Sequence, residues 1–65
     1  MLTENLNSSL RNARESAGYT IQELARESGV SAAHISMCEH GQRRLGWRAA
    51  LRLAEILRIK PVEIL

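Results

Sequence analysis

Residues 20–41 read TIQELARESGVSAAHISMCEHG, and this stretch predicts two short helices joined by a tight turn. Thr20 and Glu23 have the spacing of a capping box, in which each side chain accepts a hydrogen bond from the other residue's backbone N–H. A helix therefore begins at Thr20 and ends before Gly29, a residue that readily adopts the positive φ of a sharp turn. Ser31 is a good N-cap for the second helix.

Three further helical segments flank this pair in the sequence. Apolar residues recur every three or four positions across about 3–17 and again across about 47–58, which is the spacing of one face of a helix. Pro61 suits the first position of a short fifth helix, because its φ fits a helix and its missing N–H is not needed there. The sequence therefore predicts an all-α fold with five helices, which form a single domain over residues 1–65.

Length and composition exclude several classes of protein. A chain of 65 residues can bury only about 60% of its unfolded surface, which excludes a large enzyme with a deep pocket. The single cysteine, Cys38, cannot form an intramolecular disulfide, and this favours a reducing compartment. The sequence shows neither a leader-like segment nor an apolar run near the ~18 residues of a membrane span, so we expect a cytoplasmic protein.

Positive charge is concentrated after the second helix of the pair. The formal charge of the chain is +2, and eight of the nine basic residues are arginine, which binds phosphate through two parallel hydrogen bonds. Four arginines and one glutamate lie between Glu39 and Arg52, so this segment alone carries a charge of +3. A basic segment of this kind can contact the phosphates of a nucleic acid.

The helix pair of residues 20–41 has the arrangement of a helix-turn-helix, a corner that can present the start of its second helix to the DNA major groove. The sequence resembles the phage-repressor/Cro-like helix-turn-helix family of the xenobiotic-response-element type. The resemblance is carried by residues 19–31, 35–36, 39–41, 53–59 and 62–65, together with Leu10 and Arg14 in the first helix. It implies a five-helix DNA-binding domain that usually acts as a dimer on a palindromic operator.

The resemblance implies two sets of DNA contacts. The recognition helix, at about 32–39, would enter the major groove, and the base-facing residues are Ser31, Ala32, Ala33, His34, Ser36 and Met37. Phosphate contacts are expected from Gln22, His40, Gln42, Arg43, Arg44 and Arg48. Alanine cannot hydrogen-bond a base and contacts only a thymine methyl, so we expect sparse direct readout and a larger part for DNA shape.

Packing contacts are also expected beyond the DNA-facing residues. Arg14 and Glu39 stand where family members form a buried ion pair, which would tie the first helix to the end of the recognition helix. One short helix reads few base pairs, so we expect a homodimer, with Leu51 as an interface residue and half-sites about 10–10.5 bp apart. Trp47 and Ile56 are expected in the core.

A metal site and an active site are both weighed against DNA binding. His34 and Cys38 are one helical turn apart and His40 follows closely, but a structural zinc site needs four ligands. No metal and no cofactor is therefore expected. The same residues lack the third, orienting group of a Cys–His nucleophile, so the protein is not expected to be an enzyme.

The favoured function is that of a bacterial or phage repressor that binds double-stranded operator DNA and so regulates transcription. The alternative is a protein-interaction module on the same fold, such as an antitoxin-like or accessory partner. Ala32 and Ala33, which cannot hydrogen-bond bases, and the apolar excess of the fourth helix support this alternative.

Overall fold

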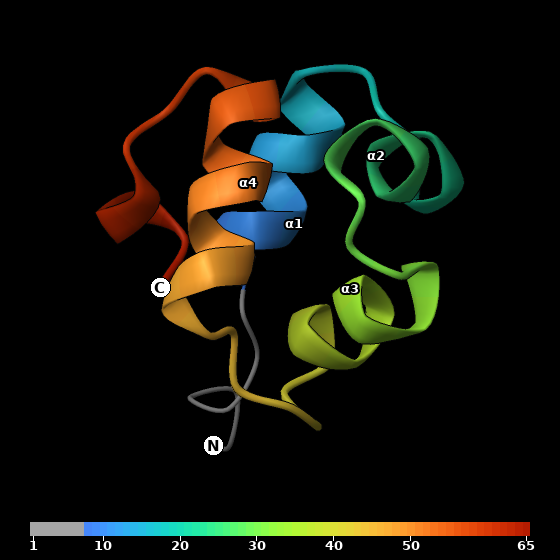
Figure 1. The fold of residues 1–65 in the computed structure, drawn as a ribbon, viewed down its shortest axis with the longest axis vertical. Helices are drawn as coiled ribbons and strands as arrows, with labels where there is room; N and C mark the ends of the chain where they lie inside the picture. Colours follow the sequence, from blue (N-terminus) through green and yellow to red (C-terminus); the bar gives the residue numbers. More distant parts are fainter. Residues whose placement is uncertain (1–7) are drawn as a thin grey trace.

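The computed structural model describes residues 8–65, which contain helices and loops and no strand. The helices are α1 (Ser8–Ser16), α2 (Ile21–Ser28), α3 (Ala32–Glu39), α4 (Trp47–Leu57) and the 3-10 helix η2 (Pro61–Glu63). In the view of Figure 1, α1 lies behind α4, with α2 and α3 on one side and η2 on the other. Any part of the expected first helix before residue 8 lies outside the described residues.

The short fifth helix that the sequence predicts at Pro61 is a single 3-10 turn over residues 61–63, so the expected count of five helices is wrong. The N–H of Glu63 donates to Lys60 O over 2.9 Å, and the N–H of Ile64 donates to Pro61 O over 3.1 Å. Ile64 then leaves the helical conformation with a φ of −120°. Such a short turn forms i to i+3 bonds in place of an α-helical ladder. Residues 8–65 therefore contain four α-helices, and none of them is long and apolar enough to cross a membrane.

The caps of α2 confirm the capping box that the sequence predicts. Thr20 N–H donates to Glu23 Oε1 over 2.9 Å, and Glu23 N–H donates to Thr20 Oγ1 over 3.1 Å. The bond from the Thr20 backbone lowers the pKa of the Glu23 carboxyl, because it stabilises the charged form. At the other end, Gly29 has a φ of 79° and its N–H donates to Ala25 O over 2.9 Å. Local residues are therefore sufficient to begin and end α2.

The core lies where one face of each helix meets the others. Each element contributes one large side chain with no exposed surface, and these are Leu10, Leu24, Ile35, Leu53 and, directly after η2, Ile64. Burying an aliphatic side chain of this size is worth about 1.5–3 kcal/mol. These contacts set the positions of α2 and α3 relative to α1 and α4.

Trp47 lies outside the core, and the prediction that it is buried is wrong. It is the first residue of α4, and its side chain is 56% exposed. The loop residue Leu45, which is only 6% exposed, covers this end of the core instead. Ile56 packs partly buried against the core, as expected. A position on the apolar face of a helix is buried only where another element lies opposite it.

Arg58 ends α4 in the left-handed conformation that favours glycine, with a φ of 60° and a ψ of 46°. This conformation costs a residue with a Cβ about 1–2 kcal/mol. We expect Arg58→Gly to raise the free energy of unfolding by about 0.5–1 kcal/mol. Glycine removes the strain of the left-handed conformation, and this gain is larger than the loss of the attraction between the arginine charge and the C-terminal end of α4. Urea denaturation followed by circular dichroism measures the change. The control is Glu55→Gly, at a helical position of α4, which should lower the free energy of unfolding by about 1 kcal/mol. A lower free energy of unfolding in both variants would contradict the prediction.

Candidate nucleic-acid interface

The turn between α2 and α3 is closed by short side-chain hydrogen bonds. Ser28 Oγ accepts from Val30 N–H over 3.1 Å, and both side chains are buried. Ser31 Oγ accepts from His34 N–H over 3.1 Å, so α3 begins directly after the turn. The two helices pack directly against each other (Figure 1). The start of α3 is therefore held at a defined angle to α2.

The opposite end of α3 is held by a buried ion pair. Arg14 Nε donates to Glu39 Oε2 over 2.7 Å, and Arg14 Nη2 donates to Glu39 Oε1 over 3.1 Å. Arg14 Nη1 also donates to Tyr19 O over 2.8 Å. The side chains are 11% and 3% exposed for Arg14 and Glu39. The hydrogen bonds to Glu39 raise the pKa of the Arg14 guanidinium, because they stabilise its charged form. The pair that the resemblance implies is present, and it ties α1 to α3.

The expected base-facing residues lie along α3 and at its N-cap. Ser31, Ala33 and Met37 are exposed, whereas Ala32 and Ser36 are partly buried. The Ser31 hydroxyl accepts the capping bond and still has its own hydrogen to donate. Neither alanine carries a polar side-chain atom. Hydrogen bonds from this face to a ligand would therefore come chiefly from the two serines.

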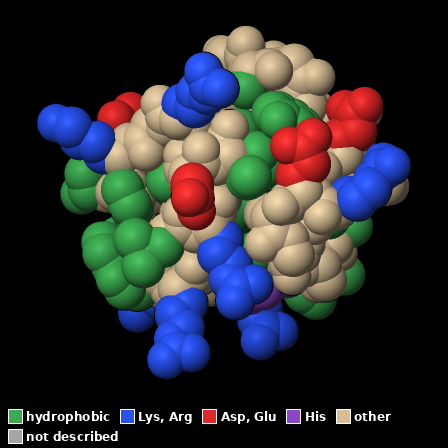
Figure 2. Space-filling view, turned by 45° about the horizontal axis from the view of Figure 1, so that its top comes forward, with side chains coloured by type: hydrophobic (Ala, Val, Ile, Leu, Met, Phe, Trp, Pro, Cys, Tyr) green, Lys and Arg blue, Asp and Glu red, His purple; other side chains and the backbone are tan. Residues whose placement is uncertain are grey.

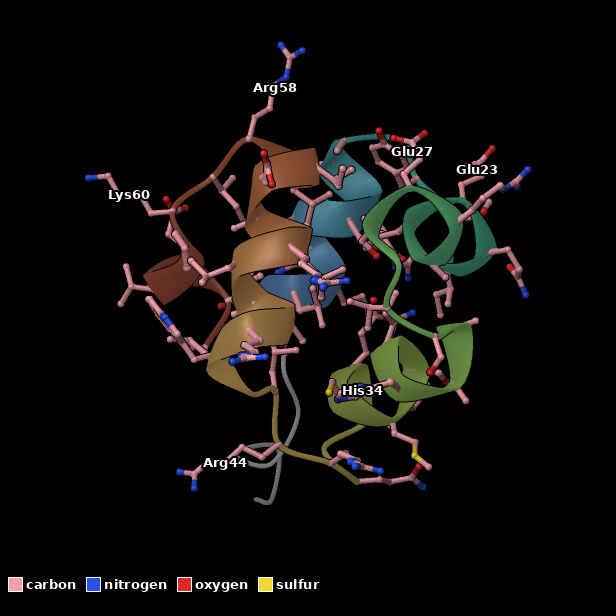
Figure 3. The ribbon with its side chains drawn as sticks, in the orientation of Figure 1. Glu23, Glu27, His34, Arg44, Arg58 and Lys60 are labelled. Atoms are coloured by element: carbon pink, nitrogen blue, oxygen red, sulfur yellow. The ribbon has the colours of Figure 1, made fainter. Side chains whose placement is uncertain are left out.

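His34 departs from its expected role as a ring presented to a base. Its Nε2 atom is buried and has no hydrogen-bond partner among the described residues. Figure 3 shows His34 close against α3, whereas Arg44 extends away from the chain. His34 stands one turn before the buried Cys38, at the margin between the buried and exposed faces of α3. The Nε2 atom is therefore unavailable to a base edge.

The loop after α3 folds back across the end of that helix. The N–H groups of Gln42 and Arg43 donate to Met37 O over 2.8 and 3.3 Å. Leu45 anchors the loop to the core, with 6% of its surface exposed. Sequence reasoning did not identify Leu45 as an anchor, although a lone apolar residue in a charged loop was the available signal. The anchor leaves the polar side chains of the loop outside.

All of the residues expected to contact phosphate are exposed, and they are Gln22, His40, Gln42, Arg43, Arg44 and Arg48. Gln22 lies apart from the others, in the first turn of α2. The remaining five lie between the end of α3 and the first turn of α4, where Arg48 is the second residue of α4. Several Lys and Arg side chains gather along the lower edge of the face in Figure 2. The structure therefore brings the basic loop and the end of α3 together.

The comparisons with known proteins agree with this geometry. A family model described as a helix-turn-helix domain matches residues 8–65. The chain belongs to the helix-turn-helix family. Its structure is similar to that of the restriction-modification controller protein C.AhdI from Aeromonas hydrophila, with a TM-score of 0.84, 31% sequence identity, and coverage of 94% of this chain and 92% of that chain. No curated protein sequence matches the chain. The protein is a DNA-binding transcriptional regulator, as the sequence indicated.

The cysteine of this helix-turn-helix protein lies inside the core. Cys38 is 1% exposed, and burial raises the pKa of its thiol. A protonated, buried thiol is a poor nucleophile and a poor metal ligand. Within residues 8–65, no group of three or more His, Cys, Asp or Glu side chains is placed to hold a metal ion. Cys38 therefore acts as a small apolar side chain in the packing of α3.

Proposed function

We propose that this helix-turn-helix protein represses transcription by occupying operator DNA, with the start of α3 in the major groove. The observation that carries the proposal is that α3 is held at both ends, by the turn of residues 29–31 and by the Arg14–Glu39 pair, while its outer side stays exposed. A helix held in advance loses little conformational entropy on binding. The similarity to a restriction-modification controller protein supports a regulatory role. In this proposal the chain acts as a single, non-enzymatic domain in the cytoplasm.

Direct base readout in this proposal is sparse. Ser31 and Ser36 donate or accept hydrogen bonds at base edges, and the two alanines of the first turn and Met37 pack against thymine methyls. His34, with its Nε2 buried, fills space beside the groove and offers no hydrogen bond from that atom. Sequence-dependent groove width and flexibility then supply the rest of the discrimination.

Phosphate contacts hold the protein on the duplex in this proposal. They come from Gln22, His40, Gln42, Arg43, Arg44 and Arg48, all of which are exposed. The first turn of α4 adds backbone N–H groups, since its N-cap Gly46 has no side chain to accept from them. Such N–H groups attract phosphate. Each neutralised phosphate releases counterions, so binding should weaken steeply with salt.

The double substitution Arg43→Ala/Arg44→Ala tests these phosphate contacts. We expect it to weaken binding to every duplex alike and to reduce the salt slope, the change of log affinity with log salt, by about 1.8, at about 0.9 for each lost contact. Fluorescence anisotropy of labelled mixed-sequence duplex, repeated at several salt concentrations, measures both quantities. Arg11→Ala/Arg58→Ala removes the same charge from other surfaces and should leave the slope near its original value. Equal slopes for all three proteins would refute the role of the loop.

A homodimer completes the proposed mode of binding. Four large apolar side chains are exposed from α4 onward, namely Trp47, Leu51, Val62 and Leu65. A second copy of the chain could cover them, with Leu51 in the interface, and the two α3 helices would then read half-sites about 10–10.5 bp apart. Sedimentation equilibrium with and without a palindromic duplex measures the assembly. A strict monomer in both samples would contradict the dimer.

A protein-interaction module on the same fold remains the second candidate function. The two alanines at the start of α3 favour it because they cannot hydrogen-bond a base, and the exposed apolar residues of α4 offer a surface for a protein partner. The anisotropy experiment separates the two functions. Absence of binding at low salt and tens of micromolar protein would refute DNA binding and leave α3 as a surface for a protein partner.

A further inference from the structure

Arg52, in the middle of α4, reaches the turn between α2 and α3. A Cβ placed on Gly29 would lie 3.2 Å from Arg52 Nη1, so the guanidinium group rests directly on this glycine. Gly29 is the residue that ends α2 and turns the chain, with a φ of 79°. Glycine is favoured here by its positive φ, and a Cβ at this position would also push the tip of the Arg52 side chain aside by a few tenths of an ångström.

The position of the guanidinium group is electrostatically favourable. The last carbonyl groups of a helix carry partial negative charge, and a cation close to them is stabilised. Gly29 is the C-cap of α2, so Arg52 brings its positive charge to the C-terminal end of that helix. Apart from Gly29's own neighbours in the chain, no other described residue comes within 4 Å of that Cβ position. Arg52 thus adds a contact between α4 and the turn, beside the burial of Val30 in the core.

This contact matters for α3 because of how α3 is attached. α3 packs against α2 and, through Glu39, against α1, and α4 packs against α2. The Arg14–Glu39 pair holds the C-terminal end of α3. The other end, which carries Ser31 and the alanines, follows the turn directly. Its position depends on the turn, which is held by the buried Val30, by the Ser28–Val30 hydrogen bond and by the contact with Arg52 of α4.

We propose that Arg52 is a positioning residue that fixes the start of α3 by holding the α2–α3 turn against α4. The proposal rests on the proposed function, in which this end of α3 reads bases. Arg52 itself contacts no base, and it acts through the turn. Its loss should therefore reduce the preference for the operator over other sequences more than it reduces binding to DNA in general.

The first test measures sequence discrimination. Arg52→Met keeps the unbranched stem of the side chain and removes the guanidinium group with its charge, and Arg11→Met makes the same change at an exposed site on α1. We expect Arg52→Met to weaken binding to an operator selected from random DNA by about tenfold, in the range of one misplaced base contact, relative to Arg11→Met. Binding to mixed-sequence duplex and the salt slope should match those of Arg11→Met. An equal loss on both duplexes with a slope reduced by about 0.9 would show a phosphate contact instead and overturn the proposal.

The second test needs no DNA and isolates the contact with the turn. Gly29→Ala should lower the melting temperature both in the wild type and in the Arg52→Met variant, because alanine is strained at positive φ. The drop should be smaller by about 2 °C or more in the Arg52→Met background, where the guanidinium group no longer crowds the Cβ. Equal decreases in melting temperature would show that the contact between Arg52 and Gly29 does not contribute to stability, and would overturn the proposal. If no duplex binds the wild type, the proposed function fails, whereas retained DNA binding with unchanged discrimination refutes Arg52 alone.

Discussion

Replacing Glu39 by alanine is expected to lower the free energy of unfolding by about 3–5 kcal/mol, the usual cost of leaving one member of a buried ion pair alone. Both carboxylate oxygens of Glu39 accept hydrogen bonds from Arg14, and the Arg14 side chain is only 11% exposed. Arginine keeps its charge at any ordinary pH, so the variant buries an unpaired cation. A domain of 65 residues is stable by about 3–10 kcal/mol, so this one change removes a large part of the total.

Urea denaturation followed by circular dichroism measures this loss, and Glu15→Ala is its matched control. Glu15 Oε2 lies 3.8 Å from Arg14 Nη2, but its side chain is 54% exposed. Loss of such an exposed pair should cost less than about 1 kcal/mol. The double variant Arg14→Met/Glu39→Met should be more stable than the sum of the two single changes predicts, because it leaves no unpaired charge. Similar losses for Glu39→Ala and Glu15→Ala would contradict the burial of the pair.

Replacing Ile35 by alanine is expected to cost about 2–5 kcal/mol, because it opens a cavity in the core. Ile35 has no exposed surface and is the large buried side chain of α3. Met37, two residues further along the same helix, is 36% exposed, so Met37→Ala should change stability by less than about 0.5 kcal/mol. The two variants therefore separate the inner face of α3 from its outer face.

The order of the two variants should reverse when DNA binding is measured, so that Met37→Ala has the larger effect. Met37→Ala removes an apolar contact to a thymine methyl, so we expect affinity for the selected operator to fall about fivefold or more, with mixed-sequence binding unchanged. Ile35→Ala should bind in proportion to the fraction of protein that is folded. Selection of operators from random DNA by each variant checks the preference. An identical preference for Met37→Ala and the wild type would show that this side of α3 does not read DNA.

The caps of α2 and α3 could be predicted because a cap depends on residues within four positions. Thr20 with Glu23, Gly29 and Ser31 each act on their own stretch of backbone, and the hydrogen bonds follow. The ion pair between Arg14 and Glu39 joins residues 25 positions apart, so no local pattern contains it. Only the resemblance to a family implied it.

The positions of Trp47, His34 and Leu45 could not be predicted from helix periodicity. Periodicity identifies the face of a helix, but burial depends on which element lies opposite, and that is decided by tertiary packing. Leu45 belongs to the core cluster, whereas Trp47, two residues later, is 56% exposed. His34 lies at the margin of α3, where one ring nitrogen is buried. The assignment of individual DNA contacts stays a prediction.

Trp47 gives the protein an optical reporter at a useful place. It is the only tryptophan in the sequence, and it is 56% exposed at the start of α4, directly after the arginine-containing loop. An indole already in contact with water changes its emission little when the chain unfolds. The same indole should shift or lose emission when a duplex or a second copy of the chain covers it. Tryptophan fluorescence therefore reports the occupancy of this surface, while circular dichroism on the same sample reports folding.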